Sequence, residues 1–525
     1  MDRSEDTRAR EIIYRELFAK VLHSFIIDPP TINVEEDGVN RLQKPIRTMA
    51  SVAVITMIAH HATHAGAFSL YTESSAAAIG NFAAGIAAEG ADASIGWYNP
   101  AGLVLIKNQQ ALLGGVGVLP NTRLTGTSTF TTIFPGLSIA PYIQSFSDLE
   151  GGESALVPSL HYALPLGDRA VFGLSIVAPF GLATNYSETS PVRYAATLSK
   201  LETVNVAPEL GGRLTDHVSI GAGLDLQYAR VKFNQMIGSP AFLQHQAVVG
   251  TPVAVTDLDS SSHNSGDSFG VGFHAGAMFM FDDNHTRIGV NYQSGISHQF
   301  SGTSVLQGRF ADPTLNIFNT EEANPSARFT SNSLYSNKID LPEVVTLSGY
   351  RDVNKKLALL GSVVYFGWSS FQAITLNNVA APALVPVPAI PGDIMQIRMN
   401  STTAEDYRNT WRVAIGANYH VNDQWMMRVG GGYDQTPTVT AARDVRLPDA
   451  DRWALSIGAH YQMWPSLGFD AGYTYLFAAS DAVVNNTLPI GDTSTYNVNA
   501  TTKSHAQLVG LQVVWTIDQV TAATK

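Results

Sequence analysis

The sequence predicts an all-β protein, an antiparallel transmembrane β-barrel of about fourteen strands. Three observations favour this fold. Charged residues make up only 14% of the 525 residues, against about 25% in ordinary soluble domains. Segments of about ten residues alternate apolar and polar side chains, and this is the length that a tilted strand needs to cross a bilayer. The links between these segments alternate between short and long.

The composition excludes several other classes of protein. A net charge of −12 argues against nucleic acid as a partner. The chain has no cysteine, so it has neither a disulfide framework nor thiol chemistry. Its mean hydropathy of +0.04 is too low for a bundle of transmembrane helices. Few charges together with 44 glycines suit an outer-membrane barrel, in which lipid-facing residues are interleaved with polar ones.

The stretch MASVAVITMIAHHATHAGA, which begins at Met49, has the pattern of a secretory signal peptide. Lys44 and Arg47 supply positive charge before it, about ten apolar residues follow, and small residues then offer a cleavage site. We therefore assign residues 49–66 to a signal peptide. Residues 1–48 form an extension of doubtful relevance, because Met49 or a site slightly upstream is expected to be the true start. A long natural leader is the alternative.

The alternation of side chains is clear in the segments VSIGAGLDLQYARVKF and WALSIGAHYQM. In the first, Ile220 and Leu224 fall on one face, and Ser219 and Asp225 fall on the other. The apolar face suits lipid and the polar face suits the lumen of a barrel. Several apolar faces begin or end with Trp or Tyr, which is typical of the aromatic girdles at membrane interfaces.

The link lengths favour a membrane barrel over a soluble β-sandwich, whose strands also alternate. Short links such as PLGDRA, LTDH and HVNDQ are expected to be periplasmic turns. A sandwich has no reason to sort its links by length in this way. The long links, expected to be external loops, are residues 185–202, 235–267, 301–331, 373–404, 436–451 and 478–501.

The sequence contains neither an H-E-x-x-H motif nor a G-x-x-x-x-G-K-S/T motif. We therefore predict no enzyme activity and no cofactor. We also predict no metal site, because His60, His61 and His64, whose spacing resembles that of metal ligands, lie at the end of the signal sequence. A barrel lipase, the remote alternative, would need a Ser, His and acid constellation near one rim. A general porin would show charged strands across its constriction.

The stretch AFSLYTESSAAAIGNFAAGIAAEGADASIGWYNPAGL resembles the N-terminal hatch of the outer-membrane long-chain fatty acid transporter family of the FadL/TodX type. Its most specific element is the triplet Asn99-Pro100-Ala101. The segments SIVAPFGLATNY, LPEVVTLSGYRDV and RLPDADRWALSIGAHYQM resemble later parts of the same family, in the same order. The resemblance covers about residues 67–517, nearly all of the mature chain.

The resemblance implies a hatch of residues 67–108 that plugs a barrel of residues 109–517 from the periplasmic side, followed by a tail of residues 518–525. It also implies lumenal binding of hydrophobic molecules, rearrangement of the hatch, and sideways exit through a kinked third strand. We expect the kink at Ala178-Pro179-Phe180-Gly181, because proline cannot donate to the ladder and glycine favours a bend. This lateral gate is expected to be coupled to Asn99-Pro100-Ala101, and the hatch would satisfy the exposed backbone.

The resemblance further implies a monomer in the lipid and lipopolysaccharide outer membrane of a Gram-negative bacterium. Its substrate would be a long-chain fatty acid or a similar hydrophobic molecule, and aromatic hydrocarbons are the alternative for the same fold. Candidate ligand contacts are Phe68, at the start of the hatch, and Gln235, Arg398 and Arg408. Gln235 stands where relatives carry a basic residue on the fifth strand, and the two arginines are regional candidates.

Overall fold

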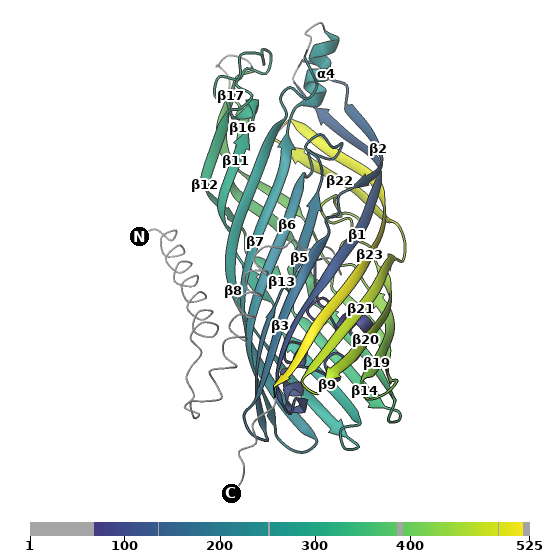
Figure 1. Ribbon diagram of the computed structural model, residues 1–525. Helices are drawn as coiled ribbons and strands as arrows, with labels where there is room; N and C mark the ends of the chain where they lie inside the picture. The colour runs from purple at the N-terminus through teal and green to yellow at the C-terminus, as the bar shows by residue number, and fades with distance from the viewer. Residues whose placement is uncertain (1–67, 135, 250–252, 386–391, 492, 518–525) are drawn as a thin grey trace, which may run out of the picture.

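The computed structural model describes residues 68–134, 136–249, 253–385, 392–491 and 493–517. The expected signal peptide, the extension before it and the C-terminal tail lie outside these residues. Within them, fourteen antiparallel strands form a closed barrel, because each pairs with the next and the last pairs with the first (Figure 1). The ring runs through β1 (Gln109–Thr132), β3 (Ala155–Pro165), β4 (Ala170–Val177), β6 (Leu198–Arg213), β7 (Val218–Ile237), β8 (Ser260–Phe281), β9 (Thr286–Gln293), β14 (Val344–Asp352), β15 (Leu357–Phe366), β18 (Thr410–His420), β19 (Trp425–Asp434), β20 (Arg452–Trp464), β21 (Leu467–Ala478) and β23 (Ser494–Ile517).

The strands expose their apolar residues outward and bury their polar residues inside the barrel. In β20, Leu455 is 63% exposed whereas the adjacent Ser456 is 6% exposed. In β7, Ile220 is exposed and Asp225 is buried. Successive side chains of a strand point to opposite faces, so one face meets lipid and the other meets the lumen. The fold class predicted from the alternation is confirmed.

Several links that the sequence predicts as long loops contain strands. Residues 373–385 and 392–404 contain the paired strands β16 and β17, and residues 478–501 contain β22 and the first part of β23. The β16 and β17 strands pair with each other, and β22 pairs with the first part of β23, which also pairs with β1. The described strands that are not counted in the ring are β2 (Tyr142–Glu150), β5 (Gly181–Asn185), β10 (Ile296–His298), β11 (Ser301–Gln307), β12 (Arg328–Ser336), β13 (Ile339–Leu341), β16 (Ala373–Leu384), β17 (Ile394–Ala404) and β22 (Ala482–Ile490).

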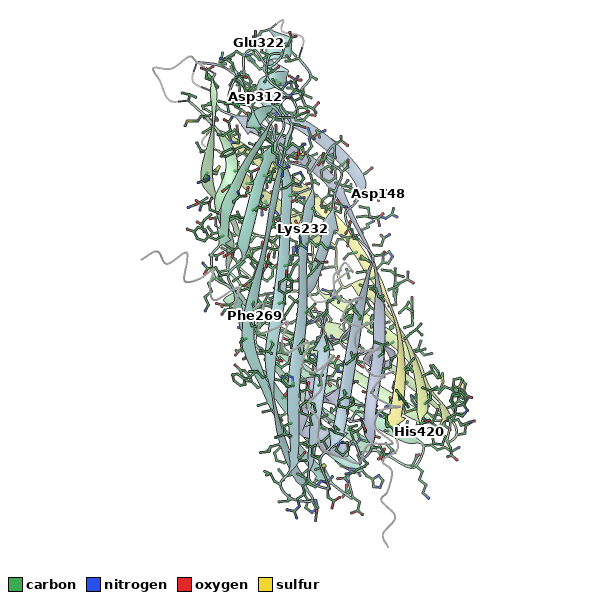
Figure 2. The ribbon with its side chains drawn as sticks, turned by 60° about the vertical axis from the view of Figure 1, so that its left-hand side comes forward. Asp148, Lys232, Phe269, Asp312, Glu322 and His420 are labelled. Carbon is green, nitrogen blue, oxygen red and sulfur yellow. The ribbon has the colours of Figure 1, made fainter. Side chains whose placement is uncertain are left out.

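The short and long links gather at opposite ends of the barrel. Asp312 and Glu322, both in a long link, lie at one end, and His420, beside a short turn, lies at the other (Figure 2). Helix α4 (Pro240–Val248) belongs to the end with the long links (Figure 1). The link lengths therefore sort by side of the barrel, as the sequence predicts.

Residues 68–108 lie inside the barrel and form short helical turns. These are η1 (Ala78–Asn81), α3 (Ile95–Tyr98) and η2 (Pro100–Leu105). Turn η2 packs on β6, β7 and β8, whereas η1 packs on β19, β20 and β21, so the segment reaches opposite walls. We call residues 68–108 the hatch. Two further turns are η3 (Arg309–Ala311) and η4 (Trp368–Ser370).

Among the described residues, no helix has both the length and the apolar character needed to span a membrane.

Candidate functional site

The third wall strand is interrupted at the four residues predicted to form a kink. It runs as β4 to Val177 and resumes as β5 at Gly181. Pairing between β3 and β4 stops at Leu160 opposite Ile176, although β3 continues as far as Ala155 along β1. Beyond the break, the ladder of β5 is made with β6 on its other side. The inter-strand ladder between the second and third wall strands is therefore open at this level.

The start of the hatch fills this opening as a short strand-like segment. The N–H of Leu70 donates to the carbonyl oxygen of Pro179, and the N–H of Gly181 donates to the carbonyl oxygen of Phe68, each at 2.8 Å. Ser69 and Phe180 form the antiparallel bridge between these two bonds. These bonds replace part of the missing ladder. They stabilise the wall because an unpaired backbone group is costly inside a membrane.

On the opposite neighbour, β6, a threonine side chain pairs with the backbone of Phe180 in the kink. The Thr203 hydroxyl donates to the carbonyl oxygen of Phe180 at 2.6 Å, and it accepts from the Phe180 N–H at 3.0 Å. Thr203 is buried. The hatch therefore pairs with Pro179 and Gly181 on one side of the kink, and Thr203 pairs with Phe180 on the other.

Phe68 lies in an aromatic cluster next to the kink. Its ring centroid is 4.6 Å from that of Trp368, 5.4 Å from that of Phe371, and 6.2 Å from those of Phe180 and Tyr407. These separations are within the range of favourable edge-to-face and tilted aromatic contacts. The first aromatic side chain of the hatch therefore joins the kink to the lumenal side of the barrel.

The Asn99-Pro100-Ala101 triplet is buried against a different part of the wall. The side-chain amide of Asn99 donates to the carbonyl oxygens of Ala87 and Ala277, at 2.8 and 3.1 Å, and its oxygen accepts from the Ala101 N–H at 3.2 Å. A side chain at Gly221 of β7 would overlap the Pro100 backbone, so this approach requires glycine. Among the described hatch residues, the backbone bonds to the kink come from residues 68–70 rather than from this triplet.

Charged wall residues hold the body of the hatch. Arg287 donates to the carbonyl oxygens of Ala88 and Glu89, both at 2.8 Å.

Other charged groups are buried inside the barrel. Within the wall, Arg428 and Asp470 form an ion pair with 2.6 Å between Nη1 and Oδ1, and both side chains are almost fully buried. On the hatch itself, burial raises the pKa of Glu73 to about 7, although Arg412 and Arg452 favour its charged form.

Two cavities lie in the lumen between the hatch and the long links. The outer cavity has a volume of about 380 Å³, and Phe242, Phe310 and Gln235 are among its lining residues. The inner cavity has a volume of about 40 Å³ and is lined mainly by apolar and aromatic side chains, including Phe68 and Tyr407. Both cavities are lined by Phe233, Ile374, Glu405 and Arg446, so these four residues mark their junction.

The charged groups at the junction are satisfied within the chain. Arg446 contacts Asp444, with 2.5 Å between Nη1 and Oδ2, and it donates to the carbonyl oxygen of Ala195 at 2.5 Å and to Gln235 Oε1 at 3.3 Å. The Tyr407 hydroxyl hydrogen-bonds to Glu405, which lies between β17 and β18. Burial, with Asp444 nearby, raises the pKa of Glu405 well above its ordinary value, and Arg446 opposes this shift.

The structure brings two of the four predicted ligand contacts to the cavities. Phe68 lines the inner cavity and Gln235 lines the outer one. Arg398 is exposed, and Arg408 is exposed while bonded to Asp451, so neither lines either cavity. Arg446 was missed, although it opens the segment RLPDADRWALSIGAHYQM, because nothing local in the sequence shows that its loop folds into the barrel.

The described residues contain no cluster of three or more His, Asp or Glu side chains that could hold a metal ion.

Sequence comparison relates the chain to one family of transport proteins. Residues 55–516 match the family described as outer membrane protein transport protein (OMPP1/FadL/TodX). The long-chain fatty acid transport protein of Escherichia coli K12 is 27% identical over 455 residues, which are 83% of this chain and 94% of that protein. The outer membrane protein P1 of Haemophilus influenzae Rd is 27% identical over 491 residues, or 88% of this chain and 97% of that protein.

Solved structures show the same architecture. A FadL homologue of Pseudomonas aeruginosa superposes with a TM-score of 0.68 at 25% identity, covering 86% of this chain and all of that one. The toluene transporter TbuX of Ralstonia pickettii superposes with a TM-score of 0.50 at 17% identity, covering 81% of this chain and 94% of that one. At that identity the second likeness supports the fold alone.

Proposed function

Because the chain belongs to the outer membrane protein transport family (OMPP1/FadL/TodX), we propose that it takes up long-chain fatty acids or similar hydrophobic molecules through the outer membrane of a Gram-negative bacterium. It would act as a monomer, and the proposal involves no catalytic step. The substrate enters the outer cavity from the side of the long links, passes to the inner cavity, and leaves sideways at the kink.

The observation that carries the proposal is the backbone pairing of Phe68 and Leu70 with the interrupted strand. A hatch segment that stands in for a wall strand can be withdrawn without unfolding the barrel. The adjoining inner cavity is mainly apolar, so a hydrophobic molecule that displaces Phe68 would reach the opening in the wall. We propose that Ala178-Pro179-Phe180-Gly181 is the lateral gate, and that the triplet at Asn99 acts on it through the hatch.

Aromatic hydrocarbons are the second candidate class of substrate. The aromatic cluster around Phe68 and Trp368 offers edge-to-face contacts to a small ring as well as to an acyl chain. At about 40 Å³ the inner cavity is smaller than the roughly 150 Å³ that holds a benzene ring in another protein, so a substrate of either class has to displace side chains to enter it. The E. coli and Salmonella typhi relatives that carry fatty acid transport in their names favour the first class.

Uptake by a host that lacks its own fatty acid transporter distinguishes fatty acids from aromatic hydrocarbons as the substrate. Cells that produce the chain are expected to take up labelled oleate well above the empty-vector level, and to take up labelled toluene no faster than that control. The exposed substitution Asp423→Asn serves as the matched variant and should behave as the unmodified chain. Uptake of toluene but not of oleate would overturn the fatty acid proposal and favour the second class.

A further inference from the structure

The two lumenal cavities meet at a polar position whose charge is balanced within the chain. Glu405 and Arg446 line both cavities, together with the apolar Phe233 and Ile374. A molecule that passes from the outer cavity to the inner one must therefore carry its polar end past Glu405 and Arg446. What these two residues can bind determines which head groups pass.

Arg446 is the one lysine or arginine among the described residues that line either cavity. Its guanidinium group is already bonded to Asp444 and to the carbonyl oxygen of Ala195. The Arg446 and Asp444 side chains are 13% and 5% exposed, so water screens their pairing weakly. An arriving carboxylate would have to displace Asp444 or add an uncompensated negative charge to a buried site, and both are costly.

Glu405 reinforces this selection. It lies in the loop that follows β17, where Tyr407 hydrogen-bonds to it. Burial and the nearby Asp444 hold the pKa of Glu405 well above its ordinary value, so the neutral carboxyl form is favoured. A neutral carboxyl group both donates and accepts hydrogen bonds, as a hydroxyl, ester or protonated acid requires of its partner.

Resting on the proposed function, we propose that the Glu405–Arg446 junction selects hydrophobic molecules whose polar end is uncharged, and disfavours the corresponding anions. The class includes long-chain alcohols, long-chain esters and fatty acids in their neutral form. The acyl chain lies among the apolar side chains on either side of the junction, and the head group exchanges hydrogen bonds with Glu405 and Gln235.

Binding of two ligands with the same chain tests the proposal on the purified barrel in detergent. The probes are cis-9-octadecen-1-ol and its sulfate monoester, which stays negatively charged at every working pH. The alcohol is expected to bind at least about tenfold more tightly than the sulfate, a difference that corresponds to about 1.4 kcal/mol. This comparison needs no substitution and is unaffected by any folding defect of a variant.

The substitution Asp444→Asn is expected to abolish this preference. Asparagine keeps the side-chain oxygen that accepts a hydrogen bond from the backbone N–H of Arg446, at 2.8 Å. It removes the negative charge that neutralises the Arg446 guanidinium group. Affinity for the sulfate should rise by about tenfold, while affinity for the alcohol should change little. Asp423→Asn makes the same change of charge at an exposed turn and should leave the ratio of affinities unaltered.

The outcomes separate this inference from the proposed function. If both probes bind and the sulfate binds as tightly as the alcohol, the head-group selection is wrong while the transport proposal stands. The head-group selection is also wrong if Asp444→Asn leaves the ratio of the alcohol and sulfate affinities unchanged while its gel migration shows that the barrel is folded. If neither probe binds, the proposed function itself fails, and the selection with it.

Discussion

The backbone N–H of Leu70 in the hatch donates to the carbonyl oxygen of Pro179 in the wall, with 2.8 Å between the two atoms. This bond stands where a neighbouring strand would pair in a regular barrel. If the hatch withdraws, the carbonyl group of Pro179 loses that partner and must find another or remain unsatisfied. Movement of the hatch and opening of the wall are therefore energetically linked.

Replacing Ala178-Pro179-Phe180-Gly181 with an alternating stretch that lacks proline and glycine should close the wall, stabilise the barrel and lower uptake. Each buried group that gains an inter-strand hydrogen bond avoids a cost of about 1–3 kcal/mol. Stability is measured as the temperature at which the folded band disappears on a gel, and transport as oleate uptake by whole cells. Pro208→Thr in the neighbouring β6 is the control and should leave uptake unchanged. Normal uptake through a closed wall would mean that the substrate leaves by another route.

Phe68→Ala should weaken ligand binding by about tenfold and lower uptake, because it removes the ring that packs on Trp368 and Phe371 at the inner cavity. Phe68→Leu keeps most of the apolar surface, so its affinity and its uptake should lie between those of Phe68→Ala and those of the unmodified chain. Binding is measured with purified protein and oleyl alcohol, and uptake with labelled oleate. Unchanged affinity together with unchanged uptake in Phe68→Ala would assign this side chain to packing alone.

Asn99→Leu should loosen the hatch without opening the barrel. The substitution leaves the carbonyl oxygens of Ala87 and Ala277 and the N–H of Ala101 without their partner, at about 1–3 kcal/mol for each buried group. Hydrogen exchange should accelerate in the hatch and stay slow in the wall strands. Asn400→Leu, at an exposed position of β17, is the control. Slow exchange in the hatch of Asn99→Leu would contradict the anchoring role.

Asp470→Asn should destabilise the barrel by roughly 3–5 kcal/mol, because it leaves the Arg428 guanidinium group charged and buried without its counterion. The measurement is the free energy of unfolding in urea after reconstitution into vesicles. Asp481→Asn removes a charge at an exposed position and should have an effect near zero. Equal stability of the two variants would show that the buried ion pair contributes no net stability.

Burial raises the pKa of Glu73 to about 7 from the ordinary glutamate value of 4.5. The folded state therefore holds a proton that the unfolded state has lost between these two values, so stability should fall as pH rises from about 4.5 to about 7 and then level off. The decrease from this group is roughly 3 kcal/mol. In Glu73→Gln that decrease should disappear from the pH profile of the unfolding free energy, whereas the exposed Glu188→Gln should keep it. A Glu73→Gln profile that matches the unmodified chain would refute the assignment.

The wall and the kink could be predicted from the sequence because each depends on local rules. Alternation with a period of two places Leu455 outside and Ser456 inside regardless of the rest of the chain. Likewise, Pro179 removes a ladder donor wherever its strand lies. The expected loops at residues 373–404 and 478–501 were wrong in part, since β16, β17 and β22 form there. Polar strands outside the membrane carry no lipid-facing pattern that would reveal them.

The polar residues of the cavities could not be predicted in the same way. The prediction of Arg398 and Arg408 as ligand contacts rests only on their charge and their region of the chain, and both side chains are exposed. Arg446 reaches Gln235 across 211 residues of sequence because the link between β19 and β20 folds inward. Such a contact depends on the three-dimensional course of a loop, and neither the periodicity of side chains nor a sequence motif predicts that course. The signal-peptide boundary stays a prediction.

The long seam between β1 and β23 constrains how the protein is assembled. The two strands pair over their full length, from Gln109 opposite Ile517 to Thr132 opposite Ser494. The circle therefore cannot be completed until the last strand has been synthesised and delivered to the membrane. The hatch directly precedes β1, so it reaches the membrane before the strand that completes the barrel. It is therefore available to pack against the growing sheet before the β1–β23 pairing closes the wall.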